Sequence, residues 1–194
     1  MSRVSSQAMI LTSASKLSGS IDMHGMTLSS VCSLSVFPTP LLQFNLHLPS
    51  FTSQALHENK YLAIHLLPPT HKSVHLSRIF ASGIKKNKRL DTSPQELKDG
   101  EVFHEMTTPF STLDKNTDWK LHSVSKDVNV PILCDSERIL ICETFKHMAV
   151  DDHEIWAVKV LEVLENPKYG DETLTGGLIY FNRGFHKIGK ILSE

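Results

Sequence analysis

The sequence predicts a mainly β protein, an antiparallel barrel or sandwich of about seven strands with a few short helices. Short segments in which apolar and polar residues alternate recur along the 194-residue chain, and proline and glycine separate them. Only two short segments are expected to be helical. The glycine-rich Gly-x-Gly-x-x-Gly motif of doubly wound parallel sheets is absent. These observations favour an antiparallel fold over an α/β fold.

The strands are expected in a regular series along the chain. The apolar run 8–12 is interpreted as a buried first strand, followed by a turn at Gly19 and Asp22. The clearest strand is Leu41 to Leu48, where leucine and phenylalanine alternate with Gln43, Asn45 and His47. Further strands are expected at 61–67, 131–134, 138–148, 155–164 and 177–182.

Two short helices are expected between the strands. Thr52 or Ser53 is predicted to cap the first, which ends near residue 59, and Thr70 to cap the second, which ends at Gly83. The second helix carries His71 and His75 four residues apart. No carboxylate completes a ligand set as in His-Glu-x-x-His, so these histidines are expected to face solvent, and no metal site is predicted.

Length and composition indicate a single globular domain over residues 1–194. Hydrophobic residues make up 40% of the chain and charged residues 21%, with a formal net charge of −1. This balance provides no reason to expect nucleic acid or an anionic membrane as partner, and no apolar run approaches the roughly 18 residues of a membrane helix. Residues 84–130 are polar and are expected to form a surface insert, with the basic run 85–89 as a solvated loop.

The cysteines indicate an intracellular protein. Cys32, Cys134 and Cys142 are odd in number and lack Cys-x-x-Cys spacing, which fits a reducing compartment such as the cytoplasm or the mitochondrial matrix. The first 21 residues carry Arg3 and Lys16 but no acid, the composition of a mitochondrial presequence. The interpretation of residues 8–12 as a buried strand is preferred, and import from a longer precursor stays open.

Gly25 to Val36 alternates hydroxyl and apolar side chains before the Pro-Thr-Pro sequence at 38–40. In an extended chain one face would carry Thr27, Ser29, Val31, Ser33 and Ser35. The opposite face, expected to enter the core for the most part, would carry Leu28, Ser30, Cys32, Leu34 and Val36. Small hydroxyls donate to an anion without adding charge, so this segment is either a phosphate-binding strand and bend or a half-exposed strand rich in serine.

Several segments in this order resemble the flavin-reductase-like FMN-binding split barrels. The resemblance covers residues 4–83 and 131–189 and rests on an ordered set of short motifs. These are Gly-Met-Thr-Leu-Ser-Ser at 25–30, Ser-Leu-Ser at 33–35 with Pro-Leu-Leu at 40–42, Pro-Ser-Phe-Thr-Ser at 49–53, Leu-Ser-Arg-Ile-Phe-Ala at 76–81, Asp152-His153, and Leu-Ile-Tyr-Phe-Asn-Arg at 178–183.

The resemblance implies a Greek-key split barrel that is normally a homodimer and holds FMN or FAD in a cleft near the dimer interface. By the same resemblance, the flavin phosphate and ribityl chain would contact Thr27, Ser29, Ser30, Ser50, Thr52 and Ser53. The backbone of Val31, Cys32 and Ser33 would lie along the flavin ring. Phe80 would help to wall the site, and His153 would face the pocket of a nicotinamide or second substrate.

The implied reaction is hydride transfer from NADH or NADPH to the flavin, with His153 in an assisting role. From chemistry alone, His153 is equally well a polar turn residue paired with Asp151 or Asp152. Asp151 replaces the glycine that usually precedes Asp-His in this family. Together with the long insert, Asp151 favours the alternative of a protein that binds flavin or assembles with a partner but has no turnover. A metal-dependent hydrolase that uses the histidines ranks last.

Overall fold

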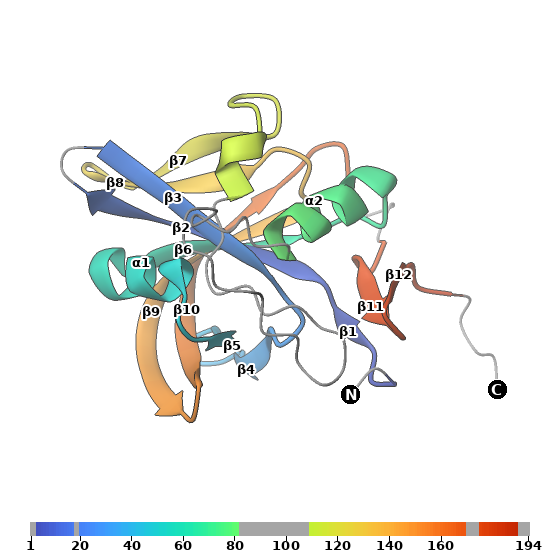
Figure 1. Ribbon diagram of the computed structural model, residues 1–194, viewed down its shortest axis with the longest axis horizontal. Helices are drawn as coiled ribbons and strands as arrows, with labels where there is room; N and C mark the ends of the chain where they lie inside the picture. The colour runs from blue at the N-terminus through green and yellow to red at the C-terminus, as the bar shows by residue number, and fades with distance from the viewer. Residues whose placement is uncertain (1–2, 18–19, 82–108, 170–174, 190–194) are drawn as a thin grey trace, which may run out of the picture.

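The main body of the protein is a seven-stranded antiparallel sheet. The computed structural model describes residues 3–17, 20–81, 109–169 and 175–189. The strand order is β3-β2-β6-β9-β10-β5-β4 (Figure 1). The bounds are β2 Met9–Leu17, β3 Ser20–Leu28, β4 Cys32–Ser35, β5 Leu41–His47, β6 Tyr61–Leu66, β9 Arg138–Val150 and β10 His153–Glu165. The mainly β antiparallel fold predicted from the alternation is confirmed, although β2, β9 and β10 run longer than expected.

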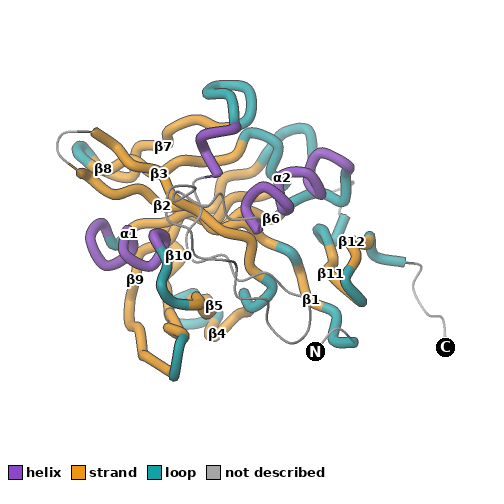
Figure 2. Tube along the Cα trace, in the orientation of Figure 1, coloured by secondary structure: helices purple, strands orange, loops and turns teal. Residues whose placement is uncertain are grey.

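The smaller elements surround this sheet, and Figure 2 shows how few of them are helical. They are helices α1 Phe51–Asn59 and α2 His71–Ala81, the 3-10 helix Pro109–Thr112, the hairpin β7 Trp119–Ser125 with β8 Val128–Leu133, and a small sheet of β1 Ser6–Gln7, β11 Ile179–Phe181 and β12 Gly184–His186. No helix in the described parts of the chain has the length and apolar character that crossing a membrane requires.

The central strands β2 and β6 are buried on both faces. Leu11 and Leu62 point into one hydrophobic cluster that also contains Phe44 and Trp156. Ile10, the neighbour of Leu11, packs on the opposite side in a second cluster with Leu76 and Phe80 of α2. Successive residues of a strand face opposite sides, so a strand covered on both sides reads as a nearly continuous apolar run. This explains the composition of 8–12 and 61–67.

His65 on β6 ties three strands together inside this packing. The side chain is fully buried, with Nδ1 2.8 Å from the carbonyl oxygen of Ile10 on β2 and Nε2 3.1 Å from the amide nitrogen of Leu133 on β8. The amide of Leu133 donates to Nε2, so the imidazole proton lies on Nδ1. Burial lowers the pKa of His65 to about 4, and the ring is neutral in the folded protein.

The helix starts follow the capping chemistry, with one correction. Thr70 caps α2 as expected, accepting a hydrogen bond from the amide of Ser73 at 3.2 Å. The N-cap of α1 is Ser50, whose hydroxyl accepts from the amide of Ser53 at 3.2 Å. Neither Thr52 nor Ser53 caps the helix, because it begins at Phe51 and both residues lie within its first turn. His71 and His75 are exposed on α2, as predicted.

The serine-rich segment is two strands rather than one. β3 ends at Leu28, residues 29–31 bend, and β4 begins at Cys32. The expectation that one face of this segment enters the core is wrong after the bend, since Leu34 is 50% exposed and Val36 80% exposed. The reason is position, because β4 is the edge strand of the sheet and, among the described strands, pairs with β5 alone, with an irregular register between Ser33 and Ser35.

A few residues in the second part of the expected polar insert pack into the core. Phe110, Trp119 and Val130 are buried, and their segments form the 3-10 helix and the β7–β8 hairpin. The prediction of a surface excursion is therefore wrong for these buried residues, whereas the other residues between 111 and 129 are exposed or half-buried. A hairpin that covers a sheet needs apolar residues on one face only, so its composition stays polar. The predicted features at Gly19, Gly83 and 85–89 lie outside the described residues.

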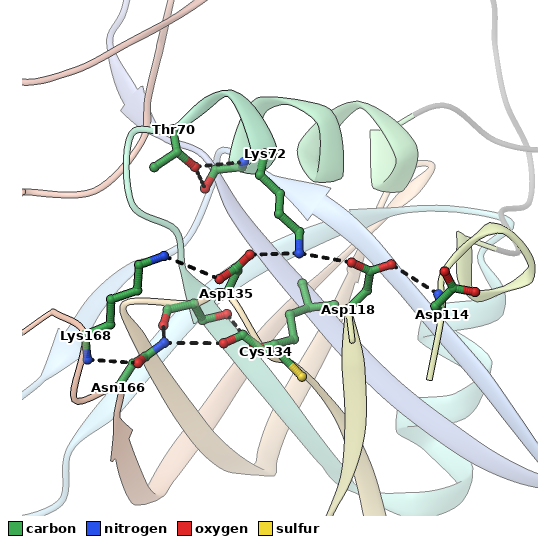
Figure 3. A network of polar contacts seen from close by, with 11 residues as sticks. Thr70, Lys72, Asp114, Asp118, Cys134, Asp135, Asn166 and Lys168 are labelled. Carbon is green, nitrogen blue, oxygen red and sulfur yellow. Dashed lines mark hydrogen bonds and ion pairs between the residues drawn. The ribbon is translucent and has the colours of Figure 1, made fainter. Parts of the chain in front are cut away.

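A polar network holds the hairpin against α2 (Figure 3). Lys72 Nζ lies 3.1 Å from Asp118 Oδ1 and 2.8 Å from Asp135 Oδ2, bridging the segments before β7 and after β8. The hydrogen bond to Asp135 raises the pKa of Lys72. Asn166 Nδ2, beyond β10, donates to the carbonyl oxygens of Cys134 at 3.3 Å and Ser136 at 3.0 Å. The network fixes the hairpin to the end of the main sheet.

Candidate functional site

A cleft of about 540 Å³ lies on the outer face of β5 and β10. This volume is within the range of small-molecule and cofactor sites. Its polar lining consists of Ser30, Gln43, Asn45 and the turn residues 151–153. The apolar lining includes Val150 and Ile155. The cleft is thus formed by segments that are distant in the sequence.

The period of the two strands determines which side chains line the cleft. On β5, Phe44 and Leu46 are buried, so Gln43 and Asn45 point to the opposite, outer face. On the neighbouring β10, Ile155 pairs with Asn45. Two amide side chains, each able to donate and accept hydrogen bonds, therefore lie beside an apolar residue.

The bend between β3 and β4 is fastened to this wall. Ser30 Oγ accepts a hydrogen bond from the backbone amide of Asn45 at 3.1 Å. The next residues continue beside the cleft, because Cys32 pairs with Gln43 across β4 and β5 and its sulfur lies 3.1 Å from Gln43 Nε2. The serine-rich segment thus approaches the cleft at Ser30 to Cys32.

The β9–β10 turn places His153 at the mouth of the cleft. His153 Nδ1 lies 2.5 Å from Asp152 Oδ1, and His47 Nε2 lies 3.0 Å from Asp152 Oδ2. The hydrogen bond from His153 lowers the pKa of Asp152. Asp151 adopts the left-handed conformation with φ of 52°, which aspartate tolerates better than most residues. The bond to Asp152 orients the His153 ring, which is about one-third exposed, with 37% of its side chain accessible.

Of the predicted site residues, the structure brings Ser30 and His153 into the lining of one cleft. Ser29, Cys32 and Ser33 are exposed on the adjoining bend and strand, and Val31 packs partly against the core.

Other predicted contacts are engaged elsewhere. Thr27 Oγ1 donates to the carbonyl oxygen of Ser77 at 2.7 Å, Ser50 caps α1, and Ser53 Oγ donates to Glu154. Thr52 is 2% exposed, and Phe80 is fully buried beside Phe110. None of these five lines the cleft, and their predicted role at a cofactor stays a prediction.

Sequence reasoning did not assign Gln43, Asn45 and Ile155 to the site. The signal was present in the alternation of β5, which put polar residues on a face that the strand leaves open. What the alternation did not reveal is the neighbour, since only the pairing of β5 with β10 brings Asn45 opposite Ile155.

Solved structures with a similar fold include proteins named as flavin reductases and an NADH:FAD oxidoreductase. Flavin reductase HpaC, solved with NADP+, is 21% identical, with 97% of this chain and 93% of that chain covered and a TM-score of 0.64. The NADH:FAD oxidoreductase SgcE6 of Streptomyces globisporus is 17% identical, with 97% and 89% covered and a TM-score of 0.65. The flavin reductase domain protein of Arthrobacter sp. FB24 is 20% identical, with 99% and 93% covered and a TM-score of 0.62.

These likenesses establish the fold, including the split barrel that the motifs implied. At the level of sequence, residues 1–189 match the model of the family described as flavin reductase like domain. The match spans both segments on which the resemblance rested and also the region between them. The chain therefore belongs to the flavin-reductase-like domain family.

Proposed function

We propose that this protein binds a flavin, FMN or alternatively FAD, in the cleft between the serine-rich bend and the β9–β10 turn, and reduces it with NADH or NADPH. The observation that carries the proposal is that Ser30 and His153, which are far apart in the sequence, line one cleft. SgcE6 has been solved with NAD and FAD fragments, which is consistent with a site for both molecules in this fold.

The residues present fit a flavin. Its three-ring system is flat, apolar on its faces and edged with hydrogen-bond donors and acceptors. Ile155 and Val150 supply apolar surface, and the amides of Gln43 and Asn45 can bond to either kind of edge group. When bound, the flavin supplies the hydride-accepting chemistry, and the protein binds and orients it.

His153 is proposed to position the second substrate. Its Nδ1–H is committed to the Asp152 carboxylate, so the ring is held and Nε2 is directed to a different partner. Nε2 then accepts a hydrogen bond, and one from the N–H of the nicotinamide carboxamide would hold the nicotinamide ring against the flavin. The bond to Asp152 is expected whether His153 is a polar turn residue or a residue of the site, so the assay below distinguishes the two roles.

A homodimer is proposed because apolar side chains beside the cleft remain exposed in the single chain. Met148 pairs with Ile155 beside the cleft and is 58% exposed, and Val150, in the lining, is 43% exposed. On the neighbouring edge strand and the residues after it, Leu34, Val36 and Phe37 are at least 50% exposed. Exposed apolar surface of this kind marks interaction sites, and a second copy would close the open side of the cleft.

The test is a titration of the purified protein with FMN and FAD, followed by NADH and NADPH oxidation assays and light scattering for the oligomeric state. The wild-type chain is expected to retain flavin through desalting and to oxidise one of the nicotinamides. His153→Ala is expected to slow oxidation by about 10-fold or more while flavin retention stays near wild type. His75→Ala, an exposed histidine on α2, is the matched control. Protein that neither retains flavin nor oxidises NAD(P)H would refute the proposal.

The second candidate is a flavin-binding or assembly protein without turnover. Asp151 favours it, because a second carboxylate next to Asp152 adds negative charge at the mouth of the cleft, where a nicotinamide nucleotide would bring its phosphates. This candidate predicts flavin retention without NAD(P)H oxidation. If the charge and the backbone conformation of Asp151 suppress turnover, Asp151→Gly should raise the rate of NAD(P)H oxidation.

A further inference from the structure

A second cluster of polar side chains lies on the opposite face of β10 from the cleft. Glu154 and Trp156 alternate with His153 and Ile155, and they are buried while the other two face outward. His147 of β9 is the direct cross-strand partner of Trp156, and His57 comes from α1. Three elements therefore bring two imidazoles and one carboxylate to one place.

The three side chains are arranged around a common point. One possible ligand atom from each of His57, His147 and Glu154 lies within 4.8 Å of the other two. His57 Nε2 is 2.9 Å from Glu154 Oε1. The rings of His57 and His147 are perpendicular, with centroids 4.6 Å apart, and both contact the Trp156 ring at 4.8 Å. The buried Trp156 indole thus packs against both imidazoles.

The carboxylate of Glu154 is held in place by a second residue. Ser53 Oγ, from the first turn of α1, donates to Glu154 Oε2. The other oxygen, Oε1, is the one that faces His57. Glu154 is 9% exposed, whereas His57 and His147 are both exposed. The cluster thus combines one fixed, buried anion with two histidines that can reorient from the solvent side.

We propose that His57, His147 and Glu154 form a binding site for a divalent transition metal ion, Zn²⁺ in the first place. Two imidazoles and one carboxylate are a ligand set that Zn²⁺ accepts, with water in the fourth position. Ligand atoms of a tetrahedral zinc site lie about 3.3 Å apart. The two exposed imidazoles can close the observed spacing by rotation, and the ion would replace the hydrogen bond between His57 and Glu154. Ser53 serves the site by orienting Glu154.

The site is separate from the flavin cleft and does not depend on the proposed function. It joins α1 to the β9–β10 hairpin, since His57 and Glu154 are 97 residues apart in the sequence. A metal ion that binds only the folded chain stabilises it by mass action. Zn²⁺ is therefore expected to raise the Tm of the protein, without any requirement for flavin or nicotinamide.

The experiment uses the full chain, stripped of metal with a chelator and desalted. Isothermal titration with Zn²⁺ measures affinity and stoichiometry, and titration with Co²⁺ reports coordination geometry through its visible absorption. The wild-type protein is expected to bind one ion per chain. His147→Ala and His57→Ala are each expected to weaken binding by at least about 10-fold, and Ser53→Ala by about 10-fold. Both histidines are exposed, so the two variants are expected to fold, and the Tm of each metal-free variant checks this.

The matched control is His122→Ala. His122 Nε2 lies 3.1 Å from Glu162 Oε2, a histidine–glutamate pair that no third ligand-bearing side chain joins among the described residues. The affinity of the His122→Ala variant for Zn²⁺ should equal that of the wild type. The proposal is overturned if the wild-type chain shows no saturable Zn²⁺ binding, or if either folded variant, His147→Ala or His57→Ala, binds Zn²⁺ as tightly as the control.

Discussion

Acid should destabilise this protein through His65, well above the pH at which carboxylates are protonated. The imidazole is buried and neutral between Ile10 and Leu133, with a pKa of about 4 in place of 6.5. Between these two values the unfolded chain binds a proton that the folded protein does not bind. Stability contributed by the neutral ring is therefore complete above pH 6.5 and is lost as the pH falls toward 4.

The magnitude follows from the two pKa values. The difference between 6.5 and about 4 corresponds to about 3 kcal/mol once the pH is below both. At pH 5 about 2 kcal/mol of this has already been lost, because the unfolded histidine is almost fully protonated and the folded one is still neutral. A loss of this size is a large fraction of the stability of an ordinary domain.

The assay is urea unfolding followed by tryptophan fluorescence, since Trp119 and Trp156 are both buried. Unfolding free energies are compared at pH 7.5 and pH 5 for the wild type and for His65→Gln, which cannot titrate. The variant is expected to be less stable at pH 7.5, because it loses the bonds of the ring, but to lose about 2 kcal/mol less on acidification. All other titrating groups contribute equally to both proteins. Equal pH dependence in the two proteins would refute the reasoning.

Two further outcomes follow from packing and burial. Gly25→Ala should lower the unfolding free energy by about 1–3 kcal/mol, because the added methyl group would lie 2.6 Å from the carbonyl oxygen of Leu11 and 2.7 Å from the Phe80 ring. Urea unfolding measures this, and a variant as stable as the wild type would contradict the close approach. Cys142 should resist alkylation in the folded protein, because burial raises its pKa to about 12, whereas exposed Cys32 should react. Mass spectrometry of alkylated peptides distinguishes the two, and early labelling of Cys142 would count against its burial.

The strands were predictable where a local pattern reflects one open face. Leu41–Leu48 alternates because β5 has core on one side and the cleft on the other, and the strand was found within one residue of its end. The β7–β8 hairpin was predicted only in part, since the expected strand at 131–134 overlaps β8. β7 was missed because a few buried apolar side chains, Trp119 and Val130 among them, are enough for the hairpin to cover the main sheet. Local composition reports how much apolar surface a segment carries, and not what lies against it.

The candidate site was predictable only in part for a similar reason. Ser30 and His153 came from motifs in a recognisable order, and they share a cleft. Thr27, Ser50 and Ser53 belong to the same motifs, but their hydroxyls bond to a carbonyl oxygen, an amide and Glu154. A hydroxyl group serves a cap, a strand edge or a ligand equally well, so its neighbours decide its role.

By itself the sequence determined the mainly β class, most strand positions and the family, because these depend on the period of apolar residues and on short motifs. Only the tertiary structure decided that Gln43 and Asn45 lie beside Ile155. It also decided that His57, His147 and Glu154 meet on the opposite face of β10. These groupings depend on the pairing of β10 with β5 and β9 and on the packing of α1. Contacts between residues about a hundred positions apart are set by the closure of the whole sheet, and no local pattern encodes them.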